Sequence, residues 1–182
     1  MKFVFRAALG LALVCATPAF AASAAPTAAK ATAADPAHIK AVQDLLTSME
    51  AEKVLIGVAS RSHYQSLDQR KAVLAKVGKV PPAEVYRRMA PALASSISAD
   101  TAAEMTRFYN TPYGKKIVFR KYNSRGGIIM PGAVMVETVT PEEKQERKRA
   151  AYVKASKELA VADPAIEHEA FNLLQAINKE KR

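Results

Sequence analysis

The chain has 182 residues and carries 27 lysines and arginines against 17 acidic residues, which gives a formal net charge of +10. Hydrophobic residues make up 49% of it, and it has one cysteine and no tryptophan. This length predicts one domain, and the composition excludes a collagen, a disulfide-rich mini-protein and a fully disordered chain.

The first 21 residues have the pattern of a secretory signal peptide. Lys2 and Arg6 supply a positive start, residues 7–16 form a short apolar run, and residues 19–21 have the Ala-Phe-Ala sequence of a cleavage site. The apolar run is shorter than the roughly 20 residues that cross a bilayer. We therefore predict cleavage after Ala21 and a periplasmic or secreted protein.

Residues 22–34 contain only alanine, serine, threonine, proline and one lysine, which is typical of a flexible linker. Cleavage would remove 21 of 182 residues and leave 161, and Cys15 would leave with the signal peptide. The mature chain would then have no disulfide, no thiolate metal site and no cysteine nucleophile. We expect a single domain over residues 35–182.

Helix-capping signals recur along this domain. A serine, threonine or aspartate before a helical apolar pattern predicts an N-cap, and a proline at the next position strengthens the signal. Glutamate three positions after the cap predicts a capping box. The expected starts are Asp35-Pro36, Thr47 with Glu50, Pro82, Ser98, Thr111-Pro112, Thr140-Pro141 with Glu143, and Asp163-Pro164.

Glycine and proline predict where these helices end. We expect the second helix to run to Gly78, the third to be kinked or split by Pro91, and the fifth to end near Gly126-Gly127. Residues 128–139 are the one segment that could be extended. Since no hairpin signal occurs, we predict an all-α fold, an irregular bundle of about six to seven helices.

Positive charge is concentrated in the middle of the chain. Residues 69–136 contain twelve lysines and arginines but three acidic residues, a net charge of +9, and most aromatic residues of the mature chain lie among them. Cations interleaved with aromatic rings can bind a polyanion. The candidate anion-binding residues are Lys115, Lys116, Arg120, Lys121 and Arg125.

The same pattern has a simpler interpretation, in which the rings belong to the core and the charges lie on a solvated face. Both interpretations stay open at this point. If the cations do bind a ligand, an exported protein would meet anionic lipid, lipopolysaccharide or wall polymer, and we expect no nucleic acid.

No motif identifies a catalytic, cofactor-binding or metal-binding residue. The histidines at positions 38, 63 and 168 are not paired at metal-ligand spacing, and the chain contains no Walker loop, dinucleotide-binding loop or nucleophile elbow. We therefore predict no cofactor and no enzyme. An envelope hydrolase with an unrecognised site stays an alternative, because catalytic triads assemble in space and not in sequence.

Residues 101–116 form the most specific stretch of the chain. A helix ending in Phe108-Tyr109 is followed by the step Thr111-Pro112 and by Gly114 with two lysines. The stretch resembles the signature of the family called domain of unknown function 2059, whose members are exported bacterial proteins. The resemblance covers about residues 80–140 and implies an all-helical fold, with no established activity, ligand or catalytic residue.

The residues of this motif have a structural interpretation of their own. Phe108 and Tyr109 would anchor one helix, Thr111 would cap the next, and Gly114 would let the two helices approach closely. We thus predict a sharp corner with both rings buried. For function, we expect an exported, non-enzymatic module that binds a protein or another envelope component, with anionic-surface binding and hydrolysis as alternatives.

Overall fold

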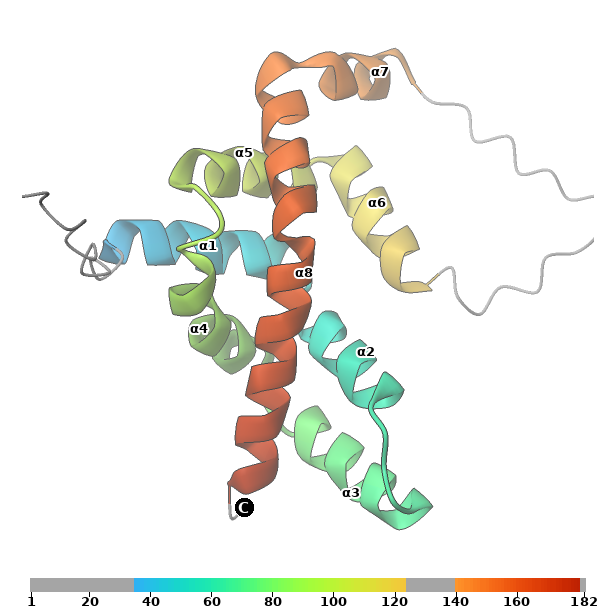
Figure 1. Cartoon of the computed structure of the whole chain (residues 1–182). Helices are drawn as coiled ribbons and strands as arrows, with labels where there is room; N and C mark the ends of the chain where they lie inside the picture. Colours follow the sequence, from blue (N-terminus) through green and yellow to red (C-terminus); the bar gives the residue numbers. More distant parts are fainter. Residues whose placement is uncertain (1–34, 124–139, 181–182) are drawn as a thin grey trace, which may run out of the picture. The chain divides into compact units, whose positions relative to one another are not determined.

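A computed structural model describes residues 35–123 and 140–180, and every regular element in these residues is an α-helix (Figure 1). The all-α prediction is therefore confirmed for the described part of the chain. The signal peptide, the linker, Arg125, Gly126-Gly127 and residues 128–139 lie outside it. The helices are α1 (Pro36–Ser48), α2 (Glu52–Arg61), α3 (Leu67–Gly78), α4 (Pro82–Leu93), α5 (Ala99–Tyr109), α6 (Pro112–Asn123), α7 (Pro141–Lys148) and α8 (Ala150–Lys179).

Four of the predicted starts are confirmed by their capping hydrogen bonds. The side-chain oxygens of Asp35, Ser98, Thr111 and Thr140 each accept a hydrogen bond from a backbone N–H two or three residues later. At Thr140 the capping box is complete, because the Glu143 carboxylate accepts the Thr140 N–H in return at 3.1 Å. A cap needs only residues close in sequence, which is why the pattern located these starts.

The predicted capping box at Thr47 is wrong. The Thr47 hydroxyl donates to the Gln43 carbonyl at 2.9 Å, within α1, so it caps nothing. The chain turns at Glu50, which has a φ of 54°, and α2 begins at Glu52. The long helix expected up to Gly78 is two helices, because Ser66 starts α3 by accepting the Gln69 N–H at 3.1 Å.

Two prolines expected to interrupt helices lie inside them. Pro91 does not split α4, which continues for two residues to Leu93. Asp163 does not start a new helix, because Pro164 lies within the 30 residues of α8. The buried stripe of α8 runs through Leu159, Ala162 and Ile166 on both sides of this proline, while Pro164 itself is exposed. The free energy gained by this continuous packing is larger than the cost of the backbone hydrogen bond that a proline removes from a helix.

The core forms around α8, which packs against α2, α3, α4, α5 and α7 (Figure 1). α1 packs against α4 and α5, and α6 packs against α5. The largest side chains that these contacts bury completely include Leu45, Leu55, Met89, Phe108, Ile166 and Leu174. Removing apolar side chains of this size from water is the main contribution to folding stability.

The corner between α5 and α6 has the buried Phe108 ring that the sequence predicted. Phe108 is 1% exposed, and its ring lies 4.3 Å from the ring of Tyr152 and 5.9 Å from the ring of Tyr113. Tyr109 is half-buried, so the prediction that both rings are buried is wrong for Tyr109. Tyr109 is the last residue of α5, and its side chain packs against the core while remaining partly exposed.

Gly114 makes this corner possible. A Cβ atom at Gly114 would lie 2.6 Å from the Cα atom of Tyr109 and closer still to the Phe108 carbonyl oxygen. Thr111 holds the same turn, since its hydroxyl donates to the Phe108 carbonyl at 2.7 Å and accepts the Gly114 N–H at 2.9 Å. The two backbones therefore touch where glycine lacks a side chain.

We predict that Gly114→Ala destabilises the protein by about 2–3 kcal/mol or more, because backbone and not a flexible side chain blocks the new methyl group. The matched control is Gly78→Ala, since a Cβ atom at Gly78 meets nothing within 4 Å. We expect the control to be neutral or to stabilise α3 by up to about 1 kcal/mol. Urea denaturation followed by circular dichroism measures both changes, and equal stability of the two variants would contradict the prediction.

A carboxylate from α8 completes the start of α5. Glu158 accepts the Ser98 N–H at 2.7 Å and the Thr101 hydroxyl at 2.7 Å, so two donors at a helix N-terminus meet one acid. These hydrogen bonds, first those from Ser98, hold the pKa of the Glu158 carboxyl below its usual value. An anion at a helix N-terminus is favourable because the helix dipole is positive there.

We predict that Glu158→Gln lowers the free energy of unfolding at pH 7 by about 1 kcal/mol. The pKa is lower in the folded state, so this contribution is present above the ordinary glutamate pKa and disappears as the pH falls through the folded-state pKa. The wild type and the variant should therefore converge in stability as the pH falls through this lowered folded-state pKa. Glu169→Gln is the control, because within the described residues Glu169 accepts a hydrogen bond only from Asn172 on its own helix. A Glu158→Gln effect that persists at acid pH would contradict the prediction.

Candidate binding groove

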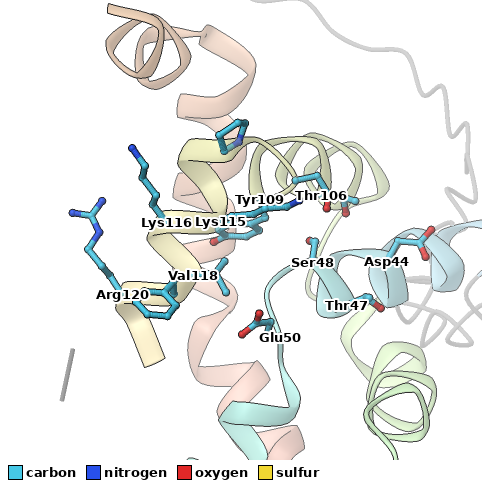
Figure 2. Close-up of a pocket in the computed structure, with 13 residues that line it drawn as sticks. Asp44, Thr47, Ser48, Glu50, Thr106, Tyr109, Lys115, Lys116, Val118 and Arg120 are labelled. Carbon is cyan, nitrogen blue, oxygen red and sulfur yellow. The ribbon is translucent and has the colours of Figure 1, made fainter. Parts of the chain in front are cut away.

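A groove with a volume of about 860 Å³ lies between the end of α1, the end of α5 and the length of α6 (Figure 2). We call it the α1–α6 groove. Its lining comes from parts of the chain that are about 60 residues apart, which the packing of α1 and α6 on α5 brings together. The lining residues are Asp44, Thr47, Ser48, Glu50, Thr106, Tyr109, Asn110, Pro112, Lys115, Lys116, Val118, Phe119 and Arg120.

Apolar and aromatic side chains contribute part of the lining of this groove. Tyr109 is half-buried, Val118 is buried, and Phe119 is 65% exposed. Burial raises the pKa of Tyr109 to about 12, so its phenol is neutral at pH 7. A phenylalanine exposed to this extent beside other apolar groups leaves apolar surface in water, and a partner could cover it.

Acidic and basic residues occupy opposite sides of the groove. Asp44 and Glu50, from the end of α1 and the turn after it, form the acidic side, and each pairs with a lysine close in sequence, Lys40 and Lys53 respectively. Lys115, Lys116 and Arg120 of α6 form the basic side. Figure 2 shows Lys116 and Arg120 extending from α6 away from Ser48 and Glu50.

The structure brings together three of the five predicted anion-binding residues. Lys115, Lys116 and Arg120 line the α1–α6 groove, whereas Lys121 lines a different hollow and lies 3.5 Å from Asp163 of α8. Arg125 lies outside the described residues. Lys115 forms no ion pair within the described part of the chain, while Lys116 pairs with Glu143 at 3.0 Å.

The Lys116–Glu143 ion pair joins α6 to α7. Glu143 is buried, and the hydrogen bond from Lys116 is the first cause that holds the pKa of its carboxyl below the usual value. A second group of charges joins α7 to α5, since Arg107 and Arg149 each contact both Glu104 and Glu146 at 2.6–3.4 Å. α7 is therefore attached to its neighbours mainly through charged side chains.

The hydroxyl and histidine side chains show no catalytic arrangement in the described residues. In the groove, Thr47 and Ser48 donate to carbonyls of α1, and no histidine is among the lining residues. His38 contacts the Ile97 carbonyl at 2.7 Å. His63 and His168 line other hollows, and no group of three metal-ligating side chains occurs in residues 35–123 and 140–180.

Sequence reasoning missed the acidic side and the role of Phe119. Asp44 belongs to no motif, and Glu50 belongs only to the wrongly predicted capping box at Thr47, so only the fold reveals that both line a groove with α6. The interpretation that places the aromatic rings in the core is wrong for Phe119, which is off the stripe of Tyr113, Ile117 and Val118 that packs inward. Helical periodicity could have found it, because a residue six positions after Tyr113 lies on a different face.

No family model, curated protein or solved structure matches the chain. The resemblance to the domain of unknown function 2059 family therefore stays a prediction. Within the described residues, none of the helices combines the length and the apolar character needed to cross a membrane.

We predict that Lys116→Gln loosens α7, because it removes the partner of the buried Glu143 carboxylate. Backbone amides of α7 should exchange with solvent up to about fivefold faster, since a pair with one exposed member contributes little. Lys115→Gln is the matched control on the same helix turn, because Lys115 has no ion pair to lose among the described residues. Hydrogen exchange measured by mass spectrometry checks this, and equal exchange in both variants would show that the ion pair does not hold α7.

Proposed function

We propose that this chain is an exported helical module that acts by binding a protein partner in the α1–α6 groove. The observation that carries the proposal is Phe119, which is 65% exposed beside the apolar groups of that groove. An apolar centre with a charged rim is the usual composition of a protein–protein interface, and aromatic residues are enriched there. Burying the ring of Phe119 would supply the binding energy, and the charged sides would set the orientation.

Export rests on the predicted signal peptide and linker of residues 1–34. The thiol-free mature chain, the lack of catalytic motifs and the resemblance to exported proteins of the domain of unknown function 2059 family agree with this proposal. The partner would then be a periplasmic or secreted protein or another envelope component.

Binding of anionic lipid, lipopolysaccharide or wall polymer is the second candidate. Lys115, Lys116 and Arg120 favour it because they line one side of the same groove. The ion pairs of Lys116 and Lys121 weaken it, since a polyanion would have to replace Glu143 and Asp163. Hydrolysis receives less support, because the hydroxyls of Thr47 and Ser48 donate to backbone carbonyls and the hydroxyl of Thr106, which also lines the groove, contacts no base among the described residues.

The first experiment is capture of a partner from an envelope extract by the immobilised protein at physiological salt. We expect saturable capture by the wild type, and loss of capture by Phe119→Ser with no loss of stability, because this side chain is mostly in water. Phe171→Ser is the matched control, since Phe171 is also exposed, at 42%, but lies on α8 outside the groove. Capture that Phe119→Ser leaves unchanged would contradict the proposal.

Vesicles separate the second candidate from the first. If the protein binds an anionic surface, sedimentation with anionic vesicles should decrease steeply as salt rises, and Lys115→Gln should weaken it more than Phe119→Ser does. Equal binding to neutral vesicles would exclude the electrostatic explanation.

A further inference from the structure

We propose that the occupant of the α1–α6 groove is a second copy of this chain, in a two-fold symmetric dimer in which Phe119 of each copy enters the groove of the other. This inference rests on the proposed function, because it names the partner for the same site. It is carried by the self-complementary charge of the groove and by the position of Phe119 in it.

The charge pattern of the groove matches its own image under a two-fold rotation. In a two-fold dimer the same surface patch faces itself, so a residue on one side of the patch meets the residues on the other side of the partner's patch. Asp44 and Glu50 of one copy would thus lie near Lys115, Lys116 and Arg120 of the other, and this contact occurs twice. A patch with a single sign of charge would repel its own copy.

Among the described residues, no ion pair joins Asp44 or Glu50 to Lys115 or Lys116 across the groove. Asp44 and Glu50 pair with Lys40 and Lys53, which lie within four residues of them in sequence, and Lys116 pairs with Glu143. Lys115 has no ion pair among the described residues. A second copy could therefore place an acidic side chain beside Lys115 without breaking an ion pair between these two sides of the groove.

Phe119 supplies the apolar contact of this dimer. It is 65% exposed and lines the groove together with Tyr109 and Val118, so one ring from each copy would be removed from water against an apolar surface. Two buried rings and a groove of this size make a small interface, and small interfaces are weak. The net charge, +10 for the full chain and +8 once Lys2 and Arg6 are removed with the predicted signal peptide, adds repulsion between copies, so we expect a dissociation constant in the micromolar range.

The test is sedimentation velocity of the purified protein from about 1 to about 500 µM at low and physiological salt. We expect a monomer–dimer equilibrium that weakens as salt rises. Phe119→Ser should weaken the dimer at least tenfold, while Phe171→Ser should leave it unchanged. A wild type that stays monomeric over this range, or a dimer that Phe119→Ser does not affect, would overturn the inference.

Charge reversal gives a stricter test of the two-fold arrangement. Asp44→Lys and Lys115→Glu should each weaken the dimer at least tenfold, because each places like charges opposite one another twice. An equimolar mixture of the two variants should dimerise again, since the introduced lysine of one chain would then meet the introduced glutamate of the other. A folding defect cannot be rescued by mixing, so failure of the mixture to associate would overturn the inference.

The results separate this inference from the proposed function. If the protein stays monomeric but captures another protein in a Phe119-dependent manner, the groove binds a partner and the dimer does not exist. If neither association occurs, both proposals fail. If only the anionic vesicles bind, the second candidate function replaces them.

Discussion

The contact between Gly114 and the backbone of Phe108 and Tyr109 determines where α6 lies, and the groove depends on that position. α6 packs against α5 as its main helical neighbour, so the turn at Thr111 and the ring of Phe108 set its direction. Once α6 is placed in this way, Val118 packs inward, and Phe119, one residue later, is left at the groove. The buried contact at Gly114 therefore determines the position of the exposed residue Phe119.

Charged side chains organise the other end of this region. α7 contains no buried apolar residue, and its one buried side chain is the Glu143 carboxylate. Lys116 and the group formed by Arg107, Arg149 and their two glutamates attach α7 to α5 and α6. Much of the basic character of residues 69–136 is therefore compensated within the fold, which a count of charges along the sequence does not reveal.

The features that the sequence predicted correctly depend on residues that are close together in the chain. The caps at Thr111 and Thr140 and the close approach at Gly114 involve atoms a few positions apart, so their pattern was sufficient. The same capping patterns wrongly predicted helix starts at Thr47 and at Asp163. In both cases tertiary packing decided the outcome, because the turn at Glu50 and the buried stripe of α8 depend on helices distant in sequence. The groove also depends on tertiary packing, since only the fold brings residues of α1 and α6 to the same groove.

The combination of groups in the groove favours a protein over a membrane or a polyanion as its occupant. An anionic surface that approached Lys115, Lys116 and Arg120 would also approach Asp44 and Glu50, and the repulsion from these carboxylates would oppose the attraction. An apolar chain alone would not use either charged side. A protein segment can present an apolar group together with both signs of charge, so it can satisfy the apolar lining and both charged sides at once. If the groove binds a partner as proposed, its acidic side would thus be as important to the choice of that partner as the cations of α6.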